Sequence, residues 1–346
     1  MLVCLSYICS NLKKHKGSMM TKAAAIIENL AFEGGGTKGS AYAGSMQIIE
    51  ELNLFHGVKR IAGTSAGSIT AVILATGGGS AGLTESIEHT NFSRFLQDPW
   101  GLVGDIKRVT LDYGLHSGDE FVVILKQFIG KFSGNPELTF HQLEVLVKKD
   151  PKKFKHLSII ASNLTTQQAQ VFNVDNHPNL PIWLAVRASM SIPLLFEPVK
   201  INSQYHVDGG LAWNFPIDLY DTTSVNETNG DSTRDYNAAT LGFFLEPAAL
   251  VDTGKAFKTN HYPIDSLKSY ASALGSYFYE TANSKHMHPE DRKRTVFIDD
   301  LGIDGKNFNI SKKNVEALIA SGRKATREYF STQNEPSAIV TEDAVA

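Results

Sequence analysis

The sequence predicts an α/β protein built on a sheet of mainly parallel strands. Short apolar runs alternate with helical segments at the start of the chain, and this βαβα order favours parallel pairing. No internal repeat is visible. The chain has 346 residues, of which 42% are hydrophobic and 20% charged, so it is long enough to bury a large core in one or two domains.

The first four elements follow from the hydrophobic pattern. Residues 28–35 form a short apolar run that ends in glycines, which is typical of a buried strand, and residues 40–52 carry apolar side chains at helical spacing. Residues 57–63 indicate a second strand. Residues 66–76 contain no helix breaker before Gly77, so we expect a helix there.

The remaining strands are expected where short runs rich in β-branched and aromatic residues lie between turn residues. These runs are residues 157–164, 169–174, 196–202, 204–210, 239–246 and 294–300. Longer segments without breakers predict the remaining helices. These segments are residues 118–130, 180–191, 264–284 and 311–330.

The composition indicates one folded unit over residues 23–330. Residues 1–22 are expected to be a poorly ordered extension, and residues 331–346 a disordered tail. Within the unit, residues 221–239 are polar and almost without large apolar side chains, which predicts a flexible surface insertion. Three methionines could each be the first residue of the natural protein: Met1, Met19 and Met20.

Charge, cysteine content and hydropathy restrict the partners and the compartment. A net charge of −3 gives no electrostatic case for nucleic acid. The two cysteines, Cys4 and Cys9, lie at the very start, so the body of the protein suits a reducing compartment. The apolar start is too short to span a bilayer, and its basic residues follow it instead of preceding it, unlike a secretory signal. We therefore expect a cytoplasmic protein or one that contacts a membrane peripherally.

The stretch "GTSAG" places one serine between two glycines at the expected turn from strand to helix. Ser65 is the centre of this G-x-S-x-G pattern, and Gly63 and Gly67 allow neighbouring backbone to pass closely. This pattern is typical of a nucleophile elbow. An ordinary turn in which Ser65 caps the following helix would give the same five residues.

The stretch "EGGGTKGS" places a second group of glycines after the first strand. Gly34, Gly36 and Gly39 satisfy G-x-G-x-x-G, but the acid that would hold a ribose at the end of the second strand is absent, which argues against a dinucleotide site. Lys38 precedes its glycine, so this is not a phosphate-binding P-loop. Backbone N–H groups here could instead bind an oxyanion beside the serine. The expected donors are Gly34, Gly35, Gly36 and Ala66.

A serine nucleophile needs a base, and the stretch "YHVDGG" offers one. Asp208 ends an expected strand and is followed by Gly209 and Gly210. A simple turn would also place an acid before two glycines. Burial among the apolar neighbours would raise the pKa of the carboxyl towards the range of an efficient base. His206 lies two residues away on the same strand face, where it could tune Asp208 or simply pair across a hairpin.

Two other functions fit the same residues. An esterase of small soluble substrates would use a Ser-Asp-His triad, for which the later histidines are His261, His286 and His288. None of these histidines lies at a strand end or beside glycines. The other alternative is a catalytically silent interaction protein, against which the intact Ser65, Asp208 and glycines argue.

Four stretches in this order resemble the patatin-like phospholipases: "GGGTKG", "GTSAG", "ASMSIPLLFEPV" and "DGG". The resemblance implies a three-layer α/β/α fold with a central, largely parallel sheet and hydrolysis of phospholipid or other acyl esters without a metal or organic cofactor. It implies Ser65 as nucleophile, Asp208 as base and the Gly34–Gly36 backbone as oxyanion hole. Lys38 matches a position where the family has Arg or Lys, and Glu33 replaces an Asp of some members.

The resemblance also bears on partners. It implies peripheral contact with a membrane surface. Some bacterial members of the family act inside host cells and need a host factor. No residue here indicates an activator or delivery into a host. The lysine-rich residues 147–156 would suit either anionic lipid or plain solvent. The apolar stripe of residues 264–284 favours core packing over an acyl groove.

Overall fold

In the computed structural model, the described residues are 26–90, 114–225, 232–246 and 287–332, with Ile264, Asp265, Tyr270 and Ala273. The described part contains a central sheet in which neighbouring strands follow the order β12-β11-β1-β2-β4-β8-β7, with β5 also paired to β4. The strands are β12 (Thr295–Asp299), β11 (Thr240–Glu246), β1 (Asn29–Phe32), β2 (Arg60–Thr64), β4 (His156–Asn163), β8 (Gln204–Asp208), β7 (Val199–Ile201) and β5 (Gln168–Phe172).

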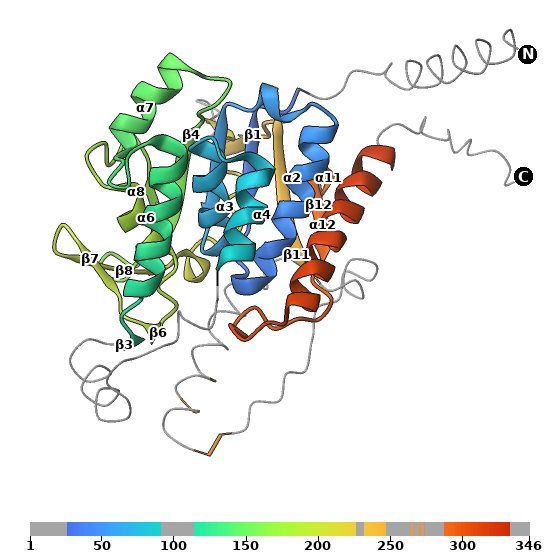
Figure 1. Cartoon of the computed structure of the whole chain (residues 1–346). Helices are drawn as coiled ribbons and strands as arrows, with labels where there is room; N and C mark the ends of the chain where they lie inside the picture. Colours follow the sequence, from blue (N-terminus) through green and yellow to red (C-terminus); the bar gives the residue numbers. More distant parts are fainter. Residues whose placement is uncertain are drawn as a thin grey trace, which may run out of the picture.

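The sheet is mostly parallel. The pairs from β12 through β11, β1 and β2 to β4 are parallel, whereas β8 and β5 run antiparallel to β4, and β7 antiparallel to β8. Helices flank it: in Figure 1, α2, α3, α4 and α12 stand in front of the strands. The helices are α2 (Ala41–Glu51), α3 (Ala66–Ala75), α4 (Gly79–His89), α6 (Asp119–Ser133), α7 (Phe140–Lys149), α8 (Ile182–Ser189), α11 (Pro289–Lys293) and α12 (Lys312–Thr332).

Aromatic side chains of β11 pack on both faces of the sheet. Phe243 stacks on Phe32 of β1, with ring centroids 5.0 Å apart, and Phe32 meets Tyr42 of α2 edge to face at 5.2 Å. Phe244, the next residue, meets Phe215 at 5.2 Å. Because successive residues of a strand point to opposite faces, these two contacts lie on opposite faces of the sheet. The predicted α/β fold with a largely parallel sheet is confirmed.

The elements differ from expectation where glycine, proline or lysine obscured the pattern. Expected strand 196–202 is divided at Pro198 into β6 (Leu194–Phe196), which pairs in parallel with β3 (Gly114–His116), and β7, which pairs with β8. The helices α4, α7 and α11 were not expected. Gly82 inside α4 is explained by packing, since a Cβ there would lie 2.7 Å from the Phe132 ring. Most of expected helix 264–284 lies outside the described residues.

The described residues of the polar segment 221–239 form two strands and a group of ion pairs. It contains β9 (Thr222–Val225) and β10 (Ser232–Asp235), which pair antiparallel. Asp221 and Asp291 each bind both Arg234 and Arg294, at 2.6 to 2.7 Å. The composition of this segment could not predict the cluster, because Asp291 in α11 and Arg294 just after it are far away in sequence. The expected extension and tail lie outside the described residues, apart from the end of α12.

Candidate active site

Ser65 forms the sharp turn between β2 and α3. Its φ of 52° and ψ of −124° are unusual for a residue with a side chain, and such strain is typical of a nucleophile elbow. The two flanking glycines make the turn possible. A Cβ on Gly63 would lie 2.1 Å from the carbonyl oxygen of Gly67, and a Cβ on Gly67 would lie 2.5 Å from the carbonyl oxygen of Phe32.

The sheet brings Asp208 to Ser65. Strand β4 pairs in parallel with β2 up to Ile160, opposite Thr64, and antiparallel with β8 from Ala161, opposite Asp208. The carboxyl ends of β2 and β8 therefore meet at consecutive residues of β4. There the Ser65 hydroxyl donates a hydrogen bond to Oδ2 of Asp208 at 2.6 Å. A hydroxyl that donates to a carboxylate at this distance can pass its proton to that carboxylate during attack.

The Asp208 carboxyl is completely buried, and each of its oxygens accepts a hydrogen bond. Oδ1 accepts from the N–H of Gly210 at 2.8 Å, and Oδ2 accepts from Ser65. Burial raises the pKa of Asp208 to about 6, and these two hydrogen bonds limit the rise. The carboxylate is therefore a stronger base than an exposed aspartate, yet is still ionised at neutral pH.

The glycine-rich loop after β1 lies beside the serine, because β1 and β2 are neighbours in the sheet. A Cβ on Gly34 would lie 3.0 Å from the Ser65 Cβ. The Gly34 N–H donates to the Asn214 carbonyl at 3.1 Å and is occupied in this structure. Within the described part of the chain, the N–H groups of Gly35, Gly36 and Ala66 donate to no protein acceptor, so they are available to an anion.

The other motif residues support these loops. The Lys38 ammonium group forms a salt bridge with the carboxylate of Asp300, at 3.0 Å. Gly39 lies against Ala66, and a Cβ on Gly209 would lie 2.4 Å from the carbonyl oxygen of Ile160. Glycine is therefore required at these positions by close packing.

Glu33 and Asn214 form a buried support behind the glycine loop that the sequence did not reveal. Nδ2 of Asn214 donates to Glu33 Oε1 at 3.0 Å and to the Gly34 carbonyl at 3.2 Å. The other Glu33 oxygen accepts from the Leu245 N–H at 2.8 Å. Burial raises the pKa of Glu33 to about 8, so the side chain is mostly neutral at pH 7. The sequence marked Glu33 only as the replacement for an Asp of some family members, and it gave Asn214 no role.

The stretch Ser189–Ser191 contacts both members of the pair. The Ser189 hydroxyl accepts from the Ser65 N–H at 2.8 Å and donates to the Ile160 carbonyl. The Ser191 carbonyl accepts from the Asp208 N–H at 2.8 Å. The sequence marked this stretch only through its resemblance to a family segment. Its contacts could not be predicted, because Ser189 and Ser65 are more than 100 positions apart.

The described histidines do not contact the Asp208 carboxyl. His206 packs against Phe172, with ring centroids 5.4 Å apart, and hydrogen-bonds the Gln204 carbonyl. His288 lies against Tyr236, where its Nδ1 is 2.9 Å from the tyrosine hydroxyl. The two other candidates for a triad, His261 and His286, lie outside the described residues.

The lysine-rich residues 147–156 lie far from the serine. They lead directly into the amino end of β4, whereas Ser65 and Asp208 lie at the carboxyl ends of their strands. No described helix is long and apolar enough to cross a bilayer. Within the same residues, no cluster of His, Cys, Asp or Glu is arranged to hold a metal ion.

A strained serine at a strand-to-helix turn, paired with a buried acid beside a glycine loop, is the arrangement of an α/β hydrolytic enzyme. The sequence also matches the model of the family "Patatin-like phospholipase" over residues 30–221. This match covers more than half of the chain, so the protein belongs to the patatin-like phospholipase family, as the resemblance predicted.

Relatives extend the match beyond the family model. The uncharacterized protein R571 of Acanthamoeba polyphaga mimivirus is 27% identical over 88% of this chain and 94% of its own length. The lysophospholipase NTE1 of Cryptococcus neoformans is 25% identical over 62% of this chain, but over only 12% of its own length. The crystal structure of VipD from Legionella pneumophila has the same fold, with a TM-score of 0.57 at 17% identity over 89% of this chain and 67% of VipD.

Proposed function

We propose that the protein is a lipid acyl hydrolase that cleaves fatty-acyl esters through a Ser65–Asp208 dyad. The observation that carries this proposal is the 2.6 Å hydrogen bond from the Ser65 hydroxyl to Asp208 at the strained turn. Membership of the patatin-like phospholipase family and similarity to a fungal lysophospholipase support lipid esters as the substrate class.

The reaction begins when Asp208 takes the proton of the Ser65 hydroxyl as the serine oxygen attacks the acyl carbonyl. The N–H groups of Gly35, Gly36 and Ala66 hold the oxyanion that forms. As the intermediate collapses, the ester C–O bond breaks, the leaving alcohol takes the proton from Asp208, and an acyl-enzyme remains. A water molecule then passes a proton to Asp208 and attacks the acyl carbon. The bond between this carbon and the Ser65 oxygen breaks, Asp208 returns the proton to that oxygen, and the fatty acid is released.

The proposal is tested by covalent labelling and by turnover. The wild-type chain is incubated with a fluorophosphonate probe, which reacts with activated serines, and the labelled peptide is identified by mass spectrometry. In parallel, fatty-acid release is measured from vesicles of mixed phospholipids with a chelator present. Labelling at Ser65 together with release is the expected result. Release with labelling at a different serine, or with no labelling, would contradict the dyad.

Ser189→Ala is expected to lower kcat by about tenfold with little change in KM, because the elbow that aims the Ser65 oxygen loses its support while the substrate contacts remain. The hydroxyl satisfies two buried backbone groups, so the free energy of unfolding should also fall, by about 1 to 3 kcal/mol. Steady-state kinetics and urea unfolding measure the two effects.

Two variants separate positioning by Ser189 from a general loss of stability. Ser189→Thr keeps the hydroxyl and should restore most of kcat. Ser45→Ala removes another buried hydroxyl, which donates to Gly322 at 3.2 Å away from the pair, and should leave kcat unchanged. Equal losses of kcat in Ser45→Ala and Ser189→Ala would show that Ser189 has no positioning role.

A further inference from the structure

The side chain of Asn214 holds the peptide group that joins Gly34 to Gly35. Its Nδ2 atom donates to the Gly34 carbonyl at 3.2 Å and to Oε1 of Glu33 at 3.0 Å. A carbonyl oxygen can only accept, so the amide must turn its nitrogen towards the loop, and the two hydrogens of that nitrogen match the two acceptors. Asn214 is buried, so both hydrogen bonds are sheltered from solvent.

Peptide geometry converts this hydrogen bond into a direction for the Gly35 N–H. In a planar trans peptide, the C=O and N–H groups point in opposite directions. In the preceding peptide, the Glu33 carbonyl accepts from the Tyr42 hydroxyl at 2.7 Å. The N–H of that peptide, on Gly34, donates to the Asn214 carbonyl at 3.1 Å. The next peptide is turned over, because its carbonyl faces Asn214. The Gly35 N–H therefore faces the side of the loop on which Tyr42 lies.

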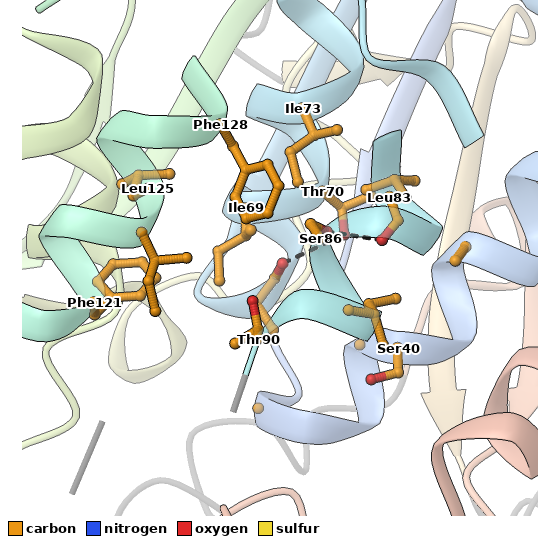
Figure 2. A pocket seen from close by; sticks show the side chains of 16 residues that line it. Ser40, Ile69, Thr70, Ile73, Leu83, Ser86, Thr90, Phe121, Leu125 and Phe128 are labelled. Atoms are coloured by element: carbon orange, nitrogen blue, oxygen red, sulfur yellow. Dashed lines mark hydrogen bonds between the residues drawn. The ribbon is translucent and has the colours of Figure 1, made fainter. Parts of the chain in front are cut away.

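This side of the loop is also the side of the nucleophile turn. Helix α2, which carries Tyr42, and helix α3, which follows the turn, stand on the same side of the strands (Figure 1). A Cβ on Gly67, at the start of α3, would lie 2.6 Å from the Glu33 carbonyl oxygen. Gly36 and Ala66 line a cavity here, which Figure 2 shows between α3, α4 and α6. The N–H of the turned peptide thus faces the side where a ligand atom has room.

The loop by itself does not fix this orientation. Gly34 and Gly35 have no side chains, so the peptide between them can rotate at little cost. Among the described residues, the donor to the Gly34 carbonyl is Asn214. A donor of an oxyanion hole must be aimed before the charge develops, because turning it during the reaction would add to the barrier. The hydrogen bond at the carbonyl also polarises the peptide, which makes its N–H a stronger donor.

We propose that Asn214 is a positioning residue that holds the Gly35 N–H towards the oxyanion formed in the reaction. This inference rests on the proposed function, because it needs Ser65 to generate that oxyanion. Glu33 holds the amide of Asn214 in turn, from the other side. Asn214 follows Asp208 in the same loop, so the loop that carries the base also aims a donor of the oxyanion hole.

The first test removes the amide and measures turnover of p-nitrophenyl butanoate. Asn214→Ala deletes the donor, and Asn214→Leu deletes it while nearly keeping the side-chain volume, so the second variant should fold even if the first does not. In both, kcat should fall about 10²-fold, the loss typical of one oxyanion donor, while KM changes less than about threefold.

Asn29→Ala is the matched control. Asn29 is also a fully buried asparagine, and its Nδ2 donates to the Thr240 hydroxyl at 3.1 Å, but it lies at the amino end of β1, away from the glycine loop. This variant should lose stability, measured by urea unfolding, and keep its kcat. A loss of kcat in Asn29→Ala equal to that in the Asn214 variants would overturn the proposal.

A second readout follows the oxyanion without turnover. When an alkyl trifluoromethyl ketone binds, the Ser65 oxygen adds to its carbonyl carbon, Asp208 takes the hydroxyl proton, and the carbonyl oxygen becomes an oxyanion that mimics the transition state. The inhibition constant of the ketone should rise about 10²-fold in Asn214→Ala and Asn214→Leu. The affinity for the corresponding alcohol, which has no carbonyl, should change less than about threefold. Equal changes for ketone and alcohol would overturn the proposal.

The two readouts separate failure of this inference from failure of the proposed function. Ester hydrolysis by the wild type, with no loss in a folded Asn214→Leu, would overturn the inference and leave the dyad intact. Ketone binding that weakens in both Asn214 variants, without ester hydrolysis by the wild type, would support the inference and contradict the proposed function. A wild type that neither hydrolyses esters nor binds the ketone would contradict both.

Discussion

Ser65→Ala is expected to lower the rate of fatty-acid release by about 10⁴-fold or more, because no acyl-enzyme can form without the hydroxyl. The fold should be retained, since among the described residues the serine side chain bonds to Asp208 and touches the sulfur of Met190. Release of fatty acid from phosphatidylcholine vesicles measures the loss, and circular dichroism checks the fold. Activity within tenfold of wild type would rule out Ser65 as the nucleophile.

The strain at Ser65 gives the same position a second measurable property. Its φ of 52° and ψ of −124° suit glycine but not alanine or serine. Ser65→Gly should therefore be as inactive as Ser65→Ala, yet its free energy of unfolding should be higher by about 1 kcal/mol. Urea unfolding of the two variants makes the comparison, and equal stabilities would show that the turn is not strained.

The parts of the site that lie at strand ends could be predicted from the sequence. Each glycine group follows a short apolar run, and parallel strands bring their carboxyl ends to one edge of the sheet. This rule places the Gly34–Gly36 loop beside Ser65 if the first two strands are neighbours, and β1 and β2 are indeed paired. Asp208 was harder, because its strand is antiparallel to β4 and reaches Ser65 only where β2 ends.

The supports of the site could not be predicted, because they depend on contacts through space. Ser189, Asn214 and Asp300 look ordinary in sequence, yet they hold the Ser65 N–H, the Gly34 peptide and Lys38. The same reason explains the polar segment 221–239, whose acid and arginine bind charges in and beside α11. Local pattern detects periodicity and turns, but it does not show which distant side chains satisfy a buried polar group.

Asp208→Asn is expected to lower kcat/KM about 10³-fold, because the amide cannot accept the serine proton. It should also stabilise the fold. The pKa of Asp208 rises from 3.8 to about 6 on folding, so the folded state holds this proton more tightly, and stability falls as pH rises from about 4 to 6. Above pH 6 the loss amounts to roughly 3 kcal/mol, and Asn escapes it. Urea unfolding at pH 8 measures the gain; a less stable Asp208→Asn would contradict the burial argument.

The same ionisation should control the pH dependence of the wild type. Because only the carboxylate can accept the serine proton, kcat/KM should fall about tenfold per pH unit below pH 6 and level off above it. The other buried carboxyl behind the glycine loop, Glu33, has its pKa raised by burial to about 8 and is the matched control. Glu33→Gln should keep the midpoint near pH 6, and the residual activity of Asp208→Asn should lose it. If Glu33→Gln instead shifted or abolished this midpoint, Glu33 would carry the controlling proton. That result would contradict a Ser65–Asp208 dyad.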